Sequence, residues 1–238
     1  APVSNILDRV SYTSGNYFTH NVSNDNSHGV WGSPDNNNIY LLQRDATSSV
    51  WKYTLSSPLD PTTANGGTSL TYTGIARSEG FVVSYQEGDR VFYSEDGSPP
   101  NICRADLGTN WDPTSSISNE TIVSLSDGFF GTLDRAPQGV DLYETYSRTD
   151  ISRRLVIMDQ TGYLEVRNQN LTTVYSNFVI DSSNVSGWTN LTNLSALRFF
   201  YGGYKLLLTS TSDIIYELDL STPYDFTTLT YPGKSINL

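Results

Sequence analysis

Histidine is the usual general base near neutral pH, and the sequence contains only two, His20 and His28. Both belong to an Asn- and Ser-rich segment before the first apolar run. Segments of that composition form loops, so we expect both imidazoles to be exposed loop side chains. No Gly-x-Ser-x-Gly, His-Glu-x-x-His, Gly-rich phosphate or Cys-x-x-Cys motif is present. We therefore predict no catalytic residue, no cofactor and no enzymatic activity.

Carboxylates are the other candidates for acid–base chemistry, because the chain carries 25 acidic residues. Those on or near the first strands of the repeat described below are Glu79, Glu87, Asp89, Asp141 and Glu144. A glycoside hydrolase needs two carboxylates at a fixed separation, which residue order does not define. A hydrolase is therefore an alternative without a specific motif.

The sequence contains no recognisable metal-binding motif. The acidic turns 87–89 and 95–97 contain carboxylates of the kind that Ca²⁺ binds, but neither follows the spacing of a twelve-residue calcium loop. We interpret them as solvated hairpin turns and predict no metal site. The single cysteine, Cys103, lies in a predicted strand, so we expect a buried, inert thiol and no intrachain disulfide.

Aromatic side chains are the strongest indication of a binding surface. The chain has 16 Tyr and 4 Trp among few lysines, and stiff amphipathic rings provide contact area at a low entropic cost. Sugar-binding sites use such rings beneath pyranose faces. The candidates on first strands and in a predicted loop are Trp31, Tyr85, Tyr143, Trp188 and Tyr201. For each ring, packing inside the fold is the competing interpretation and the favoured one.

The net charge of −11 argues against two classes of partner. An acidic surface repels the phosphate backbone and anionic lipid, so we expect no nucleic-acid binding and no membrane docking. No run of 18 or more apolar residues is present.

One segment recurs along the chain. Residues 50–63 and 215–228 align without a gap, 102–114 is a looser copy, and 164–168 is a shorter one. With Tyr53, Ala105, Val166 and Leu218 as equivalents, the spacings are 52, 61 and 52 residues. Internal repeats of this length indicate arrays, propellers or solenoids.

Each copy lies within the same order of short apolar runs. First strands are predicted at 29–31, 81–85, 140–143 and 197–201. Second strands are predicted at 39–42, 90–93, 154–158 and 204–208, and fourth strands at 69–72, 121–125, 174–180 and 229–237. Four short strands in about 50 residues, joined by tight turns, are typical of a propeller blade.

The sequence therefore predicts an all-β, β-propeller-like domain at 28–238, with about four four-stranded blades. The blade boundaries are approximately 28–75, 76–130, 131–192 and 193–238. Residues 1–27 form a separate segment, in which 9–13 resembles one extra N-terminal strand. A β-sandwich is the alternative architecture.

The recurring segment ends in a tail with a characteristic composition. Proline cannot donate to a strand ladder, and Asp and Thr cap turns, so the tail should end the third strand and direct the fourth. The large tail side chains Leu59, Trp111 and Tyr224 are then expected to fill gaps between blades. The copy at 164–168 lacks this tail.

The segments at 50–64 and 214–228 resemble a blade repeat found in bacteriophage and environmental viral proteins. That repeat reads Val-Tyr-x-Tyr-x-Leu-Ser-Thr-Pro-Trp-Asp, followed by a Thr- and Ala-rich stretch. The resemblance is good for two copies, fair for the third and poor for the fourth, and covers about two-thirds of the chain. It implies a propeller in a virion structural protein, such as a tail or fibre component.

The leading hypothesis is thus a non-enzymatic structural or adhesive component on the surface of a phage virion. It predicts a multi-chain assembly in which the partners are other virion proteins, a host-surface glycan, or both. Two alternatives are a free lectin-like propeller, with equivalent sugar pockets in successive blades, and a propeller hydrolase, with converging carboxylates.

Overall fold

Sixteen strands make up the described part of the chain, and they form four sheets of four strands each. In this computed structural model the described residues are 27–44, 48–72, 78–84, 87–97, 99–125, 130, 137–146, 151–189 and 193–237, and the statements below concern these residues alone. Within each sheet, neighbouring strands follow one another in the chain. Each sheet is therefore one blade of a β-propeller-like fold, and the predicted fold class is confirmed.

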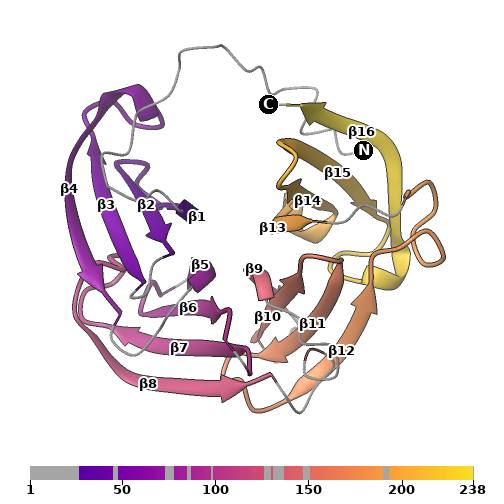
Figure 1. Cartoon of the computed structure of the whole chain (residues 1–238), viewed down its shortest axis with the longest axis horizontal. Helices are drawn as coiled ribbons and strands as arrows, with labels where there is room; N and C mark the ends of the chain where they lie inside the picture. The colour runs from indigo at the N-terminus through magenta and orange to yellow at the C-terminus, as the bar shows by residue number, and fades with distance from the viewer. Residues whose placement is uncertain are drawn as a thin grey trace. The chain divides into compact units, whose positions relative to one another are not determined.

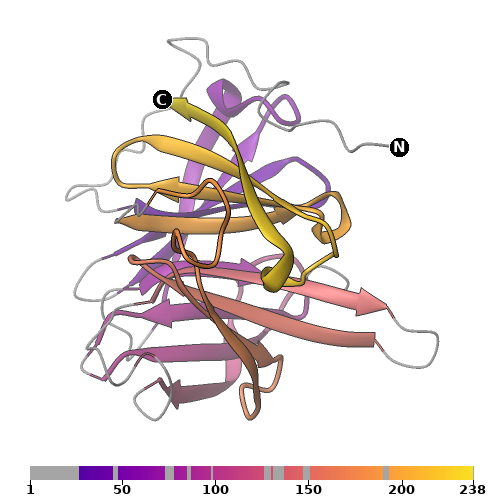
Figure 2. The same cartoon turned by 90° about the vertical axis from the view of Figure 1, so that its right-hand side faces the viewer.

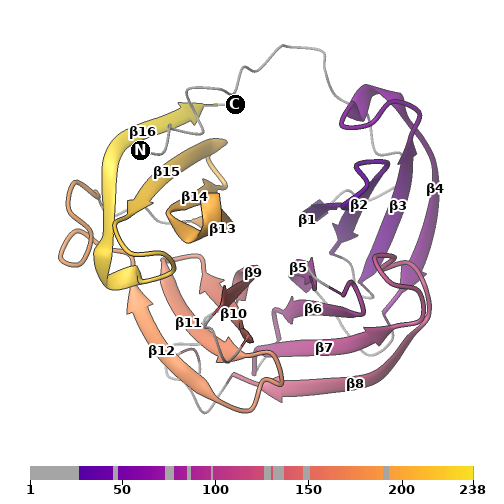
Figure 3. The ribbon, with the colours of Figure 1, turned by 180° about the vertical axis from the view of Figure 1, so that it is seen from behind.

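The chain divides between Pro137 and Gln138 into two compact units. The N-terminal unit contains blades 1 and 2, whose first strands β1 and β5 lie side by side (Figures 1 and 3). Blade 1 consists of β1 (Ser27–Gly32), β2 (Asn38–Gln43), β3 (Ser49–Leu55) and β4 (Ala64–Thr71). Blade 2 consists of β5 (Ser78–Val83), β6 (Arg90–Glu95), β7 (Asn101–Leu107) and β8 (Ile117–Ser124).

The C-terminal unit contains blades 3 and 4, and β10 contacts β13 within it. Blade 3 consists of β9 (Pro137–Tyr146), β10 (Ile151–Asp159), β11 (Tyr163–Asn168) and β12 (Val174–Val179). Blade 4, drawn in gold and yellow in Figure 2, consists of β13 (Leu194–Phe200), β14 (Lys205–Ser210), β15 (Ile214–Leu220) and β16 (Leu229–Asn237).

Every predicted strand with described residues overlaps one of these strands. The four predicted blade ranges each contain one sheet, apart from Ser27 at the start of β1. Four separate sheets, rather than the two of a β-sandwich, account for the described residues. The extra strand predicted at 9–13 lies outside the described residues. Among the residues that the structure describes, no helix has the length and apolar character needed to span a membrane.

A shared break in the strand ladder supports the alignment of the repeats. The register between the third and fourth strands shifts around Tyr53 in blade 1, Ala105 in blade 2 and Leu218 in blade 4. These are the residues that the sequence aligns. In blade 3 the shift lies one step later, between Val166 and Arg167, in the copy with the weakest sequence match. The repeat is therefore a repeat of backbone geometry as well as of residue type.

The tail ends the third strand as predicted. Asp60, Asp112 and Asp225 each accept a hydrogen bond from the backbone N–H two residues later, at 3.0 Å. After Asp60 and Asp225 the chain makes one 3₁₀ turn, Pro61–Thr63 or Phe226–Thr228, and continues directly into β4 or β16. The capped turn thus aims the fourth strand back along the blade.

Removing one cap tests this role. We expect Asp225→Ala to lower the free energy of unfolding by about 1 kcal/mol, because the Thr227 N–H loses its acceptor. Asp225→Asn keeps a side-chain oxygen and is expected to retain most of the stability. Urea denaturation of both variants measures the difference, and equal losses would contradict the capping role.

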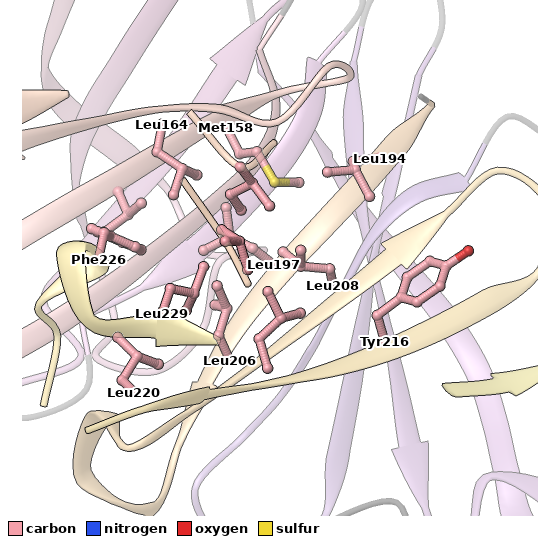
Figure 4. Close-up of a cluster of buried hydrophobic side chains, with 14 of the residues drawn as sticks. Met158, Leu164, Leu194, Leu197, Leu206, Leu208, Tyr216, Leu220, Phe226 and Leu229 are labelled. Atoms are coloured by element: carbon pink, nitrogen blue, oxygen red, sulfur yellow. The ribbon is translucent and has the colours of Figure 1, made fainter. Parts of the chain in front are cut away.

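The blades of the C-terminal unit share one hydrophobic core (Figure 4). Met158 and Leu164 from blade 3 belong to the same buried cluster as Leu197, Leu206 and Leu208 from blade 4. Each of these side chains is at most 5% exposed. Burial of apolar area between two sheets is the main stabilising contribution here, because a single blade has no other means of covering its faces.

Candidate binding site

The two aromatic side chains among the three tails, Trp111 and Tyr224, fill gaps between blades, as predicted. In the N-terminal unit, Trp111 of blade 2 stacks on Trp31 of blade 1, with ring centroids 6.4 Å apart and planes 2° apart. In the C-terminal unit, Tyr224 of blade 4 stacks on Tyr143 of blade 3, at 4.3 Å and 7°. Trp31 and Tyr143 are buried. The structure therefore assigns these two binding candidates to interblade packing.

The third tail side chain corrects the prediction. Leu59 is 74% exposed, so it does not fill a gap between blades. The reason lies in the direction of the tails. Trp111 and Tyr224 both point toward the preceding blade of their own unit. Blade 1 is the first blade of its unit, so Leu59 has no preceding blade there.

Trp188 is also buried, although it lies in the predicted loop. Its ring makes edge contacts with Tyr216 at 5.4 Å and with Tyr231 at 5.2 Å. The loop is fixed over blade 4 because the Tyr231 N–H donates to the Ser186 carbonyl at 3.0 Å. The structure thus assigns Trp188 to packing. Tyr85 lies outside the described residues.

Tyr201 is the predicted binding residue that the structure leaves accessible. It begins the turn between β13 and β14, residues 201–204, which we call the aromatic turn. Tyr201 and Tyr204, at the two ends of this turn, are 43% and 42% exposed, and Phe200 beside them is 38% exposed. Three large exposed rings therefore lie within five consecutive residues. A contiguous group of this kind is typical of a contact surface.

The backbone of the aromatic turn is fixed by the rest of blade 4. Tyr201, Gly202 and Gly203 have φ values of 49°, 63° and 88°, and this left-handed conformation disfavours a tyrosine. The Leu220 N–H donates to the Tyr204 carbonyl at 2.9 Å, and the Tyr224 N–H donates to the Gly203 carbonyl at 3.1 Å. These bonds fix the backbone that carries the two tyrosines, which reduces the entropic cost of ordering the turn on binding.

Charged groups lie next to the aromatic turn on the same blade. Phe200, Lys205 and Asp219 are directly opposite one another on three adjacent strands, so their side chains share a face. The Lys205 ammonium lies 2.8 Å from Glu217 and 2.5 Å from Asp219. Burial disfavours the charged amine, but the two carboxylates outweigh it and raise the pKa of Lys205. The ammonium thus holds Asp219 in place while the carboxylate remains 39% exposed.

This combination offers two kinds of contact to a ligand. The exposed phenol rings present flat apolar faces, and Asp219 supplies a carboxylate that accepts hydrogen bonds from hydroxyl groups. The surface contains no unpaired cation at this position, since Lys205 is neutralised by its two partners. A neutral polyhydroxyl ligand suits it better than a phosphate does.

A second polar cluster lies between blades 1 and 2. Glu79 of β5 is fully buried, with His28 Nδ1 at 2.5 Å and Arg44 Nε at 2.9 Å. Arg44 also contacts Asp96 at 2.7 Å. Neither Glu79 carboxylate oxygen has an aligned hydrogen bond, so His28 and Arg44 contact this carboxylate at ion-pair distance. The prediction of a loop side chain was wrong for His28, because it lies in β1 opposite a buried carboxylate. His20 lies outside the described residues.

Among the candidate acids, Asp141 is the one with a clearly raised pKa. It is 1% exposed and accepts the Phe199 N–H at 2.8 Å and the Leu142 N–H at 2.9 Å, with Arg198 at 3.1 Å. Burial raises the pKa of Asp141 to about 7, and the two backbone hydrogen bonds only partly oppose that rise. Asp141 joins blades 3 and 4 through the backbone of β13. This contact accounts for its position without a substrate.

The described side chains of the remaining candidate acids do not converge on a second site. Glu87 is exposed, Asp89 lies 3.7 Å from Arg90, and the side chain of Glu144 is outside the described residues. In the described ranges no group of three His, Cys, Asp or Glu residues is placed to hold a metal ion. Cys103 is buried in β7, as predicted, and burial raises the pKa of its thiol.

Comparisons with known proteins give similar solved structures but no family. No protein-family model matches the sequence, and no curated protein matches it. One similar solved structure is the β-propeller domain of Cps50 (Swd1) from Myceliophteria thermophila, at 13% identity and a TM-score of 0.49 over 86% of this chain and 57% of that one. Another is a glutaminyl cyclase from Myxococcus xanthus, with the same identity and TM-score, over 81% of this chain and 65% of that one. The chain spans less than two-thirds of either structure, and neither likeness assigns it an activity.

Sequence reasoning missed two parts of the site. The predicted second strand of blade 4 includes Tyr204, but the structure places Tyr204 at the end of a tight turn, which Gly202 and Gly203 indicate. Asp219 belongs to the recurring segment. Its position beside the aromatic turn follows only from the strand register, which pairs it with Lys205.

Proposed function

We propose that this β-propeller-like protein is a non-enzymatic adhesive component of a phage particle, and that its aromatic turn binds a host-surface glycan. The observation that carries the binding part is the exposure of Tyr201 and Tyr204 on a rigid turn beside Asp219. The resemblance of residues 50–64 and 214–228 to viral blade repeats supports the particle assignment. Other virion proteins are then the expected neighbours of the same chain.

The first–second strand turns favour one glycan site over several equivalent ones. In blade 1 this turn has the sequence Ser33-Pro34-Asp35-Asn36-Asn37 and no aromatic side chain. Blade 4 presents two tyrosines at the corresponding position. A lectin with equal pockets in every blade requires equal turns, so the turns of blades 1 and 4 do not form equivalent sites.

The glycan proposal is tested by removing rings from the aromatic turn. Purified full-length chain is first applied to a glycan array, and the affinity for the best ligand is then measured by calorimetry. We expect Tyr201→Ala and Tyr204→Ala each to weaken binding about tenfold, because each removes a stacking face. Tyr175→Ala is the matched control, since Tyr175 is 47% exposed but lies on β12 of blade 3.

The outcomes are distinct. An affinity unchanged in both tyrosine variants, or lowered equally by Tyr175→Ala, would contradict the assignment of the aromatic turn. Hydrolysis of the bound glycan that Asp141→Asn abolishes would replace adhesion with an enzyme that uses the perturbed acid. Immunogold electron microscopy of particles from the native source tests the location, and labelling confined to free protein would reject the virion.

A further inference from the structure

The outer strands of the four blades differ in how well their edges suit pairing with another chain. In blades 1, 2 and 4 the outer strand contains one residue with a left-handed φ: Gly66 at 73°, Asn119 at 50° and Gly233 at 81°. The same strands carry further residues that disfavour pairing, namely Gly67 in β4, Glu120 in β8, and Pro232 and Lys234 in β16. Such residues protect exposed sheet edges from other chains.

The outer strand of blade 3, β12, has none of these protective features. Its sequence, Val-Tyr-Ser-Asn-Phe-Val, contains no glycine, proline or charged residue, and none of its residues has a positive φ. It is the last strand of its sheet (Figure 1), and within the described residues it pairs only with β11. The register of that pair is regular from Ser176 to Val179. Short uncharged segments of this composition pair readily with other chains.

The hydrogen-bond register identifies the backbone groups of β12 that face outward. The Ile180 N–H donates to the Gly162 carbonyl at 2.9 Å, and the next paired residues are Val179 and Tyr163. In an antiparallel ladder, pairs that exchange hydrogen bonds alternate with pairs whose amides point away from each other. Asn177 and Val179 therefore direct their N–H and C=O groups away from β11, toward the open side of the strand.

The side chains along β12 are exposed and uncharged. Val174 and Tyr175 are 45% and 47% exposed, and the next two residues, Ser176 and Asn177, are exposed as well. The Arg154 guanidinium carbon lies 3.9 Å from the centroid of the Tyr175 ring, so this ring is held beside the strand. Copies of a chain with a net charge of −11 repel one another, but along β12 two copies meet without like charges directly opposite each other.

We propose that β12 is an association site for a second copy of this chain, with the two β12 strands paired antiparallel about a two-fold axis at Asn177. An antiparallel edge is complementary to itself, because the rotation brings the outward N–H and C=O groups of Asn177 in one copy against those of Asn177 in the other. The contact joins two sheets of four strands into one of eight and closes as a dimer. It is independent of glycan recognition, since the aromatic turn belongs to blade 4.

Sedimentation velocity over a concentration series measures the association, and we expect the wild-type sedimentation coefficient to rise with concentration. Asn177→Pro removes an outward N–H and no bond to β11, which an edge strand tolerates. We expect it to weaken the dimer about tenfold, because two hydrogen bonds are lost across the axis. Asn177→Ala is the matched control, since it removes the same side chain but keeps the N–H, and is expected to associate like the wild type. Circular dichroism checks that both variants are folded.

A charge exchange at Asn177 identifies the partner as a second copy and does not depend on the proline variant. Asn177→Lys and Asn177→Asp each place like charges opposite each other at the axis, and each alone is expected to lose association. An equimolar mixture of the two is expected to restore it, because lysine then faces aspartate. A wild-type monomer at every concentration, or a mixture that does not recover, would overturn the proposal. So would wild-type association of the Asn177→Lys variant alone, or equal losses in folded Asn177→Pro and Asn177→Ala.

Discussion

Replacing Gly203 with alanine is expected to lower the free energy of unfolding by about 3 kcal/mol. Two effects add up at this position. A left-handed φ of 88° costs a residue with a side chain about 1–2 kcal/mol, and forcing extra atoms into a packed region costs about 1–3 kcal/mol. A Cβ at Gly203 would lie 2.6 Å from three atoms of the Tyr224 ring. That ring has little room to retreat, because it is stacked against Tyr143 and contacts Phe199.

Gly202→Ala provides a control one residue away. Gly202 also has a positive φ, but no heavy atom lies within 4 Å of its hypothetical Cβ, so we expect only the conformational cost of about 1–2 kcal/mol. The N-terminal unit offers the same comparison. A Cβ at Gly88 would lie 2.2 Å from Trp111, whereas Gly66 has open space. Urea denaturation measures all four variants. Equal losses within each pair would contradict a steric cost from the Tyr224 and Trp111 rings.

Replacing Lys205 with methionine is expected to destabilise the protein by about 3–5 kcal/mol, because it leaves Glu217 buried without its cation. The side chains of Lys205 and Glu217 are 4% and 0% exposed. The raised pKa of Lys205 sets the pH range of the effect. A raised folded-state pKa stabilises the protein below the unfolded-state pKa, and this stabilisation is lost as the pH rises through the folded value. At pH 7 the Lys205 amine is charged, so the full destabilisation by Lys205→Met is expected at that pH.

A double variant separates the effect of the unpaired Glu217 charge from the effect of the changed side-chain volume. Lys205→Met combined with Glu217→Leu removes the unpaired charge, and we expect it to recover at least half of the lost stability. Lys52→Met is the comparison for a more exposed pair, since the Lys52 and Asp112 side chains are 27% and 22% exposed. Its expected cost is below about 1 kcal/mol. A double variant as unstable as Lys205→Met would contradict the charge explanation.

The fold could be predicted because its signals are local and repeated. Alternating apolar runs identified the strands, and a tail with Pro, Asp and Thr identified the third–fourth strand turns in blades 1, 2 and 4. The alignment on Tyr53, Ala105 and Leu218 held even though these side chains differ in size. The reason is that each lies at the same register shift. Backbone geometry constrained those positions more strongly than side-chain volume did.

The site was less predictable because exposure depends on neighbours that are distant in sequence. Trp31 and Tyr143 lie on first strands and Tyr201 directly follows one, and composition does not separate the three. Trp31 and Tyr143 are covered because the next blade of their unit supplies a tail ring, whereas Tyr201 belongs to the last blade of its unit. His28 was misassigned for a similar reason, since its partner Glu79 is contributed by a different blade.

The register shifts also affect the outer edges of blades 1, 2 and 4. On the outer strands they place a left-handed residue, Gly66, Asn119 or Gly233, opposite the third strand. An outer edge interrupted in this way cannot offer an unbroken row of amides and carbonyls to another polypeptide. The outer strands of blades 1, 2 and 4 are therefore poor templates for strand-by-strand aggregation.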